Sequence, residues 1–367
     1  MLLLKIASPI IFIIGIFGNL LSFSIFTNER MKHLPTFRFL SYLSMIDCLY
    51  ILIGIPHIMS ITFFNYDFRN TSNFVCSIHS FLTIYLSHLS SNVLAAIGVF
   101  RCAELTSIKS ISKRNKYAIV NRSNILNKDQ KNVIYSANKF RISFGKIEFI
   151  LTFIMFILFI FDSHYLIYMR LTYDHSIYEY NSTDVFICYP SPNETAFYYY
   201  KFYVTLWPWI DLFLYSYIPF IIMMSSTVII IFKLFTAANK LKRKYDSNQI
   251  KYEKSIIENS TLCLQTTLRV TTENKIMFEA AKRRAKRNNQ VYKLLLTLNT
   301  TFFILVTPIV LTNSLKLLDK KNELTLELVY VLAYLNHCLN FIFYGLTCEL
   351  FRKNLIKKLT FWTENYI

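Results

Sequence analysis

Seven apolar runs, each long enough to cross a lipid bilayer, constrain this chain more than any other feature. About 20 apolar residues are needed to span roughly 30 Å of hydrocarbon. In lipid, every backbone polar group must be satisfied within a helix or a closed barrel. The 6 Gly and 8 Pro among 367 residues provide few of the turns that a sheet requires. The sequence therefore predicts an all-α fold, in which residues 1–347 form one seven-helix transmembrane domain. The predicted spans are 2–26, 37–63, 74–106, 147–169, 201–235, 290–318 and 324–347.

The basic residues are concentrated between these runs. The formal net charge is +18, and most of the Lys and Arg lie in residues 109–146 and 240–287. This placement follows the positive-inside bias of cytoplasmic loops and not the basic face of a nucleic-acid-binding domain. We therefore expect a multi-pass plasma-membrane protein that contacts the lipid bilayer and binds no nucleic acid. Its short N-terminus would lie outside the cell and its C-terminus in the cytoplasm.

The segment after the seventh run has a different pattern. Residues 348–367 place Leu350, Phe351 and Leu355 at helical spacing beside Lys and Arg residues. Such a pattern is typical of an amphipathic helix that lies on a membrane surface. We expect a short surface helix followed by a short cytoplasmic tail.

The predicted outer segments carry two kinds of covalent signal. Asn70, Asn181 and Asn193 each begin an N-glycosylation sequon. Of the seven cysteines, Cys76 and Cys188 are the two that the topology places outside. A pair of cysteines in an oxidising compartment is a disulfide candidate. This disulfide would tie the start of the third span to the loop before the fifth.

Several polar residues lie where an apolar side chain would be expected. Asp47 stands in the middle of the second span, where insertion of a carboxylate costs roughly 3 kcal/mol. The other buried polar candidates, which could form one network with it, are Asn19, Ser90, Asn92, Asn336, His337 and Asn340. These side chains either form a hydrogen-bonded network that holds the bundle together, or bind a sodium ion through oxygen atoms of Asp47, Ser90, Asn336 and Asn340.

Motifs of catalysis are missing from the sequence. It contains no His-Glu-x-x-His, no Cys-x-x-Cys and no glycine-rich phosphate loop. The seven histidines do not cluster at metal-ligand spacing, and each is interpreted as a satisfied or interfacial side chain. We therefore expect no enzyme activity and no cofactor other than the sodium ion.

Motifs in six of the seven spans together resemble the rhodopsin-like G-protein-coupled receptors. They include Gly18-Asn19, Asp47, Arg101 after Cys76, the two prolines Pro219 and Pro308, and Asn340 with Tyr344. Departures occur at Phe100-Arg101-Cys102, where the family has Asp-Arg-Tyr, at Val306, at Phe341 and at Thr227. Because Arg101 lacks its acidic neighbour, the resemblance implies either raised basal activity or a rewired coupling element.

A narrower resemblance rests on Trp207-Pro208-Trp209-Ile210-Asp211 and on Leu335 to Phe341. These segments look like those of invertebrate FMRFamide and myosuppressin-type neuropeptide receptors. The resemblance implies an extracellular peptide as ligand and a heterotrimeric G protein as partner. Alternatives are a chemosensory small-molecule receptor on the same fold, or a transporter or channel. The ligand-binding residues implied are Thr83, Asp211, Tyr215, Asn313, Tyr330 and Tyr334. Those implied for activation and coupling are Asn19, Arg101, Pro219, Pro308, Asn340 and Tyr344.

Overall fold

The computed structural model describes most of the seven apolar runs and the segments next to them. It covers residues 2–29, 31–120, 144–173, 186–191, 196–233, 235–236, 239, 243, 286, 289–312 and 323–366, with 104–120, 144–146, 173, 323 and 361–366 as backbone alone. Within these residues, seven helices are long and apolar enough to cross a membrane. The predicted fold class, a seven-helix transmembrane bundle, is therefore confirmed. The helices are α1 (Leu2–Phe26), α2 (Pro35–Phe64), α3 (Asn73–Val120), α5 (Phe144–Asp162) continued by α6 (His164–Tyr168), the fifth span Trp207–Lys233, the sixth span Asn289–Thr312, and α11 (Glu323–Thr347).

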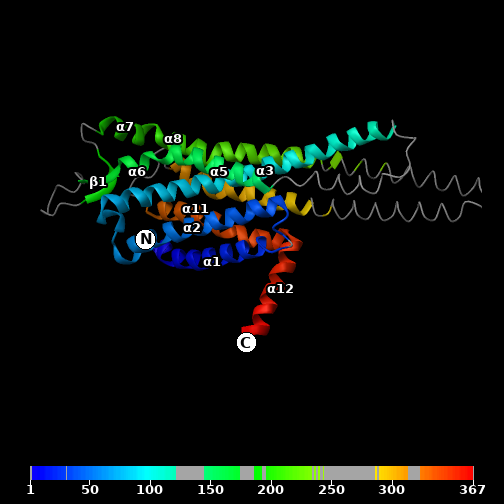
Figure 1. The fold of residues 1–367 in the computed structure, drawn as a ribbon. Coiled ribbons are helices and arrows are strands. Elements are labelled where there is room, and N and C mark those ends of the chain that lie inside the picture. Colours follow the sequence, from blue (N-terminus) through cyan, green and yellow to red (C-terminus); the bar gives the residue numbers. More distant parts are fainter. Residues whose placement is uncertain are drawn as a thin grey trace, which may run out of the picture.

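The helices lie alongside one another, and α3 is in contact with several of them. α1 packs against α2 and α11, while α3 packs against α2 and α5 (Figure 1). Large apolar side chains point outward from the bundle, for example Phe149 on α5, which is 72% exposed. In water such a surface would drive association, whereas in a bilayer it contacts lipid.

The last helix, α12 (Glu349–Tyr366), turns away from the bundle (Figure 1). Its Phe351 is fully buried and packs against Phe26 of α1 and Tyr344 of α11, with ring centroids 5.3 and 5.7 Å apart. The more distal Ile356 and Leu359 are exposed. This arrangement agrees with the predicted amphipathic helix on the membrane surface.

The fifth predicted span is not one regular helix. α7 (Phe197–Thr205) ends before Leu206, and α8 (Trp207–Asp211) begins there because Pro208 suits the first turn of a helix. A π-helical turn, η3 (Leu212–Tyr217), follows, in which Ile218 N–H donates to Phe213 O.

Pro219 has no N–H to continue this i to i−5 pattern, so the carbonyl of Leu214 lacks its backbone donor. Asn92 of α3 donates to that carbonyl from Nδ2 at 3.4 Å. A side chain of the third helix therefore completes the backbone of the fifth.

A β-hairpin and a short helix stand at one end of the bundle, which we call the hairpin end. β1 (Met169–Tyr173) pairs with β2 (Phe186–Pro190) in antiparallel register, with Leu171 opposite Cys188. The 3-10 helix η1 (Phe68–Thr71) connects α2 to α3 next to β2. The opposite end of the bundle carries α12 (Figure 1).

A glycine permits the close approach of α2 to α11. A Cβ atom at Gly54 would lie 2.9 Å from Cε1 of Tyr334 and even closer to its hydroxyl, whereas a Cβ at Gly345 would meet nothing within 4 Å. We expect Gly54→Ala to destabilise the protein by about 1–3 kcal/mol through overpacking, measured as a lower melting temperature in detergent. Gly345→Ala is the control and should be neutral or stabilising by up to about 1 kcal/mol. Equal melting temperatures for the two variants would contradict this packing.

Candidate functional site

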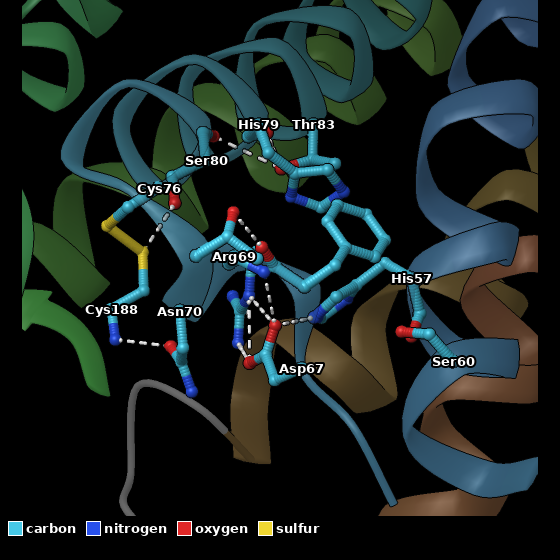
Figure 2. Close-up of polar contacts among 12 residues, drawn as sticks. His57, Ser60, Asp67, Arg69, Asn70, Cys76, His79, Ser80, Thr83 and Cys188 are labelled. Atoms are coloured by element: carbon cyan, nitrogen blue, oxygen red, sulfur yellow. Dashed lines mark hydrogen bonds and ion pairs between the residues drawn. A yellow bond between two sulfur atoms is a disulfide. The ribbon is translucent and has the colours of Figure 1, made fainter. Parts of the chain in front are cut away.

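The hairpin is held at three points, two on α3 and one on η1. Cys76 and Cys188 form the predicted disulfide, with an S–S distance of 2.02 Å. The Cys188 N–H donates to Oδ1 of Asn70 at 2.8 Å, and the Leu171 N–H donates to Oδ1 of Asn73 at 2.8 Å. Figure 2 shows Asn70 and the disulfide side by side. Each strand of the hairpin is thus held by an asparagine, and β2 also by a covalent bond.

Next to the disulfide, Asp67 organises the α2 to α3 connection (Figure 2). Its carboxylate accepts hydrogen bonds from the backbone N–H, Nε and Nη2 of Arg69, and its Oδ1 lies 3.0 Å from Nε2 of His57. Burial raises the pKa of Asp67, but the hydrogen bonds from His57 and Arg69 outweigh this effect and hold the pKa below its ordinary value. The rings of His57, Phe68 and His79 pack against one another beside this pair.

In the middle of the bundle, the predicted polar network around Asp47 is present. Asp47 is fully buried on α2. Its Oδ1 accepts from Ser90 Oγ of α3 at 2.7 Å, and its Oδ2 accepts from Asn340 Nδ2 of α11 at 2.8 Å. Asn19 of α1 donates from Nδ2 to the carbonyl of His337 at 3.0 Å. Four helices are therefore connected through one hydrogen-bonded group.

His337, one of the polar candidates in the seventh span, is a further member of this network. Its Nδ1 lies 2.7 Å from Asp47 Oδ1. Asp47, Ser90 and Asn340 supply oxygen atoms of the kind that sodium prefers, and Asn336 is buried one residue before His337. However, an imidazole N–H on the carboxylate takes a position that a cation would need, so the arrangement fits sodium poorly. The sodium site stays a prediction, and comparing melting temperatures in sodium and potassium chloride tests it.

A second buried cluster joins α3, α5 and α8, and sequence analysis missed it. His88 Nδ1 lies 3.0 Å from Oδ1 and 3.1 Å from Oδ2 of Asp162, while its Nε2 lies 2.9 Å from Oδ1 of Asp211. The signal was available, since Asp162 is an ionisable residue inside an apolar run and such a residue needs a partner. Because each histidine was interpreted on its own, the contacts of His88 with two acidic residues were not predicted.

The residues implied for ligand binding do not all contact one another. Asp211 lies at the His88 cluster, and the ring of Tyr215 is 5.8 Å from that of His88. Tyr334 stacks on Tyr50 at 5.2 Å. Thr83 donates to the backbone carbonyls of His79 and Ser80, and Tyr330 is 38% exposed.

Among the described residues, no hydrogen bond or ring contact joins Thr83, Tyr330 or Tyr334 to Asp211. Asn313 lies outside the residues that the structure describes, as do the predicted glycosylation sites Asn181 and Asn193.

The residues implied for activation lie deeper and nearer the α12 end. Tyr344 is fully buried between Phe26 and Phe351. Arg101 is half-buried on α3, and Pro219 follows the π-helical turn. Pro308 lies inside the sixth span, where Thr312 donates to its carbonyl at 2.9 Å. Thr227 of the fifth span accepts from Asn299 of the sixth at 3.0 Å, so the position where the family often has a tyrosine links these two helices.

At the α12 end, Glu349 connects the sixth span to α12. It accepts from Gln290 Nε2 at 3.0 Å and pairs with Lys286 at 3.1 Å and with Lys353 at 3.0 Å. The hydrogen bonds from Lys353, Gln290 and Lys286 lower the pKa of Glu349 to about 2. The carboxylate therefore stays ionised at any physiological pH.

A bundle of seven apolar helices with a polar interior and a disulfide-tied hairpin is the architecture of a multi-pass membrane receptor. Comparison with family models gives a match to the 7 transmembrane receptor (rhodopsin family) over residues 135–344. Because the match covers more than half of the 367 residues, the chain belongs to this family of receptors, whose members signal through G proteins. A search among curated proteins finds no match.

The matched segment includes the last four spans. Asn19, Asp47 and Arg101 lie before it. Their roles therefore rest on their own contacts and on the motif resemblance. Membership of the family excludes the transporter or channel alternative as the primary function, and it is consistent with the expectation that this protein is not an enzyme.

The two functions of Asn70 can be separated by substitution. Asn70→Asp removes the sequon but keeps an oxygen acceptor for the Cys188 N–H, whereas Asn70→Ala removes both. We expect Asn70→Ala to lower the melting temperature by the equivalent of about 1 kcal/mol and Asn70→Asp to preserve it. Both variants should lose one glycosidase-sensitive shift on a gel, which would also place the hairpin end outside the cell. If both variants melt alike, the Asn70 contact does not stabilise the hairpin.

Proposed function

We propose that this receptor binds an extracellular peptide with a cationic residue near an amidated end, of the FMRFamide-like kind, and activates a heterotrimeric G protein. The observation that carries the proposal is Asp211. Its side chain is 18% exposed and is the accessible carboxylate of an otherwise buried cluster. A guanidinium group pairs with a carboxylate in a planar, bidentate way and stacks on aromatic rings.

The surroundings of Asp211 support a cationic ligand group. Trp207 and Tyr215 flank His88, with ring centroids 6.4 and 5.8 Å from the imidazole. Aromatic faces near a carboxylate attract cations through the ring quadrupole. Thr83, Tyr330 and Tyr334 would contact other parts of the peptide, and Asn313 would do so from the predicted end of the sixth helix.

The proposed orientation places the hairpin end outside the cell and α12 in the cytoplasm. The disulfide and the sequon at Asn70 support it, because both modifications occur in the secretory pathway. The ligand would enter at the hairpin end. The G protein would bind at the opposite end, where Arg101 and Tyr344 lie, and where the sequence places the basic ends of helices five and six.

A small cationic molecule is the second candidate ligand, on a chemosensory receptor of the same fold. It is favoured by the burial of Tyr215 and Tyr334, which are 6% and 7% exposed. A ligand that contacted side chains buried this far within the bundle would be compact and not a long chain. Both candidates require the same cation at Asp211.

The ligand class and Asp211 are tested together. Cells expressing the receptor with a promiscuous G protein should release calcium in response to submicromolar Arg-Phe-amide peptides. We expect Asp211→Asn to weaken potency by at least about 30-fold, because a buried charge pair contributes about 2 kcal/mol or more. Asp184→Asn, which removes a charge that the sequence places in the outer loop, is the matched control and should leave potency within about twofold.

Silence across a library of amidated peptides, with surface expression confirmed, would shift the proposal to the small-molecule ligand. A response that survives Asp211→Asn unchanged would contradict the role of Asp211 and leave the peptide class standing.

A further inference from the structure

The cluster of His88, Asp162 and Asp211 holds two carboxyl groups against one imidazole. His88 and Asp162 have fully buried side chains, and His88 lies within 3.0 Å of both acids. The three residues come from α3, from the last residue of α5 and from the last residue of α8. The cluster therefore lies between three helices, and Asp211 is its accessible member.

The hydrogen-bond geometry fixes the charge of the cluster. Each of the two nitrogen-to-carboxyl contacts requires one shared proton, so the three groups hold two protons. The imidazolium between two carboxylates has a net charge of −1. The neutral imidazole between one carboxylate and one carboxylic acid has the same net charge. Both of these two-proton arrangements thus leave one negative charge in the bundle.

No basic side chain neutralises that charge within the part of the chain that the structure describes. The ion pairs there that involve Asp162 or Asp211 are those with His88. An uncompensated charge inside a helix bundle is energetically unfavourable. One further positive charge, brought by a ligand, would balance the cluster.

The two acids differ in access. Asp162 has no exposed side-chain surface, so a ligand cannot reach it, whereas Asp211 retains 18%. A cation that arrives at Asp211 meets a carboxyl group whose Oδ1 already has a donor, His88 Nε2. The ligand must therefore compete with an internal donor for this oxygen.

We propose that His88 is the specificity-determining residue of the ligand site. It engages Asp211 in the ligand-free receptor, and a cationic ligand binds by taking Asp211 from it. His88 then stays paired with Asp162, and the ligand cation is paired with Asp211, so that each pair has no net charge. A guanidinium competes well because it is always charged and donates two parallel hydrogen bonds. An uncharged isostere binds the carboxylate too weakly to replace the contact between His88 and Asp211. This inference rests on the proposed function, because it requires a ligand with a cationic group.

The matched double variant His88→Gln with Asp162→Asn tests the competition. His88→Gln alone would leave the buried Asp162 without its charged partner and could fail to fold. The double variant replaces the charged internal donor and its anchor with neutral hydrogen-bonding groups, so that only a neutral amide can compete for Asp211, and it keeps the cluster charge at −1. Its folding is checked by its melting temperature.

Binding is measured on purified receptor in lipid nanodiscs with two probes. One is the peptide Phe-Met-Arg-Phe-amide, and the other has citrulline in place of arginine, which is nearly the same shape without the charge. We expect the double variant to bind the arginine peptide at least about fivefold tighter than wild type, since replacing a charged competing donor with a neutral one corresponds to about 1 kcal/mol. The citrulline peptide should gain more, because an uncharged group can then reach Asp211 without displacing an imidazolium, so the affinity ratio between the two peptides falls. Adding Asp211→Asn should abolish the gain.

Unchanged affinity for both peptides, or an unchanged ratio between their affinities, would overturn the role of His88, because a purely structural role does not depend on ligand charge. If neither peptide binds either protein, the proposed ligand class fails and the inference falls with it. That outcome differs from the failure of the inference alone, in which wild type binds the arginine peptide and the variant discriminates between the two peptides as wild type does.

Discussion

A buried carboxylate must have hydrogen-bond donors, and this requirement determines how the interior of the bundle is arranged. Two acidic clusters satisfy it, and α3 contributes to both. On one side, Ser90 meets Asp47, with Asn340 and His337 of α11 on the same carboxylate. On the other side, His88 meets Asp162 and Asp211. Because Ser90 and His88 are two residues apart, they leave α3 in different directions, and each holds a different set of helices. The third helix is therefore the element through which the two halves of the bundle are connected.

These connections are relevant to signalling because a ligand acts only through its different affinities for two arrangements of the helices. The cluster at Asp211 is at the proposed ligand site, and the cluster at Asp47 adjoins the buried Tyr344 region through α11. α3 contacts both, and it also carries Arg101. Phe100-Arg101-Cys102 lacks the acidic residue that the family has before this arginine. Contacts of the sixth span within the described residues include those of Asn299 with Thr227 and of Gln290 with Glu349.

The sequence was sufficient to predict the helical class, the seven spans, the Cys76–Cys188 disulfide and three of the residues around Asp47. These features depend on hydropathy, on topology and on the cost of a charge in lipid, all of which can be evaluated along the chain. Asp162 inside an apolar run indicated that a partner was needed, but the partners in the His88 cluster could not be identified in that way, because the three residues are far apart in sequence. His337 was recognised as a polar residue in the seventh span, but its contact with Asp47 depends on how α2 and α11 face one another. The break at Leu206 depends on a proline within an apolar run, where hydropathy does not change.

The π-helical turn at Leu212–Tyr217 has a consequence for how this chain is compared with its relatives. Such a turn accommodates one residue more than an α-helix of the same length, and one residue corresponds to about 100° of rotation around the helix. Residues on the α8 side of the turn are therefore rotated relative to the residues after Pro219. A relative with a regular helix here would present a neighbouring position, and not the counterpart of Asp211, toward α3. Counting backward from the proline would then pair Asp211 with a residue that faces elsewhere, so alignments of this helix require a one-residue gap within η3.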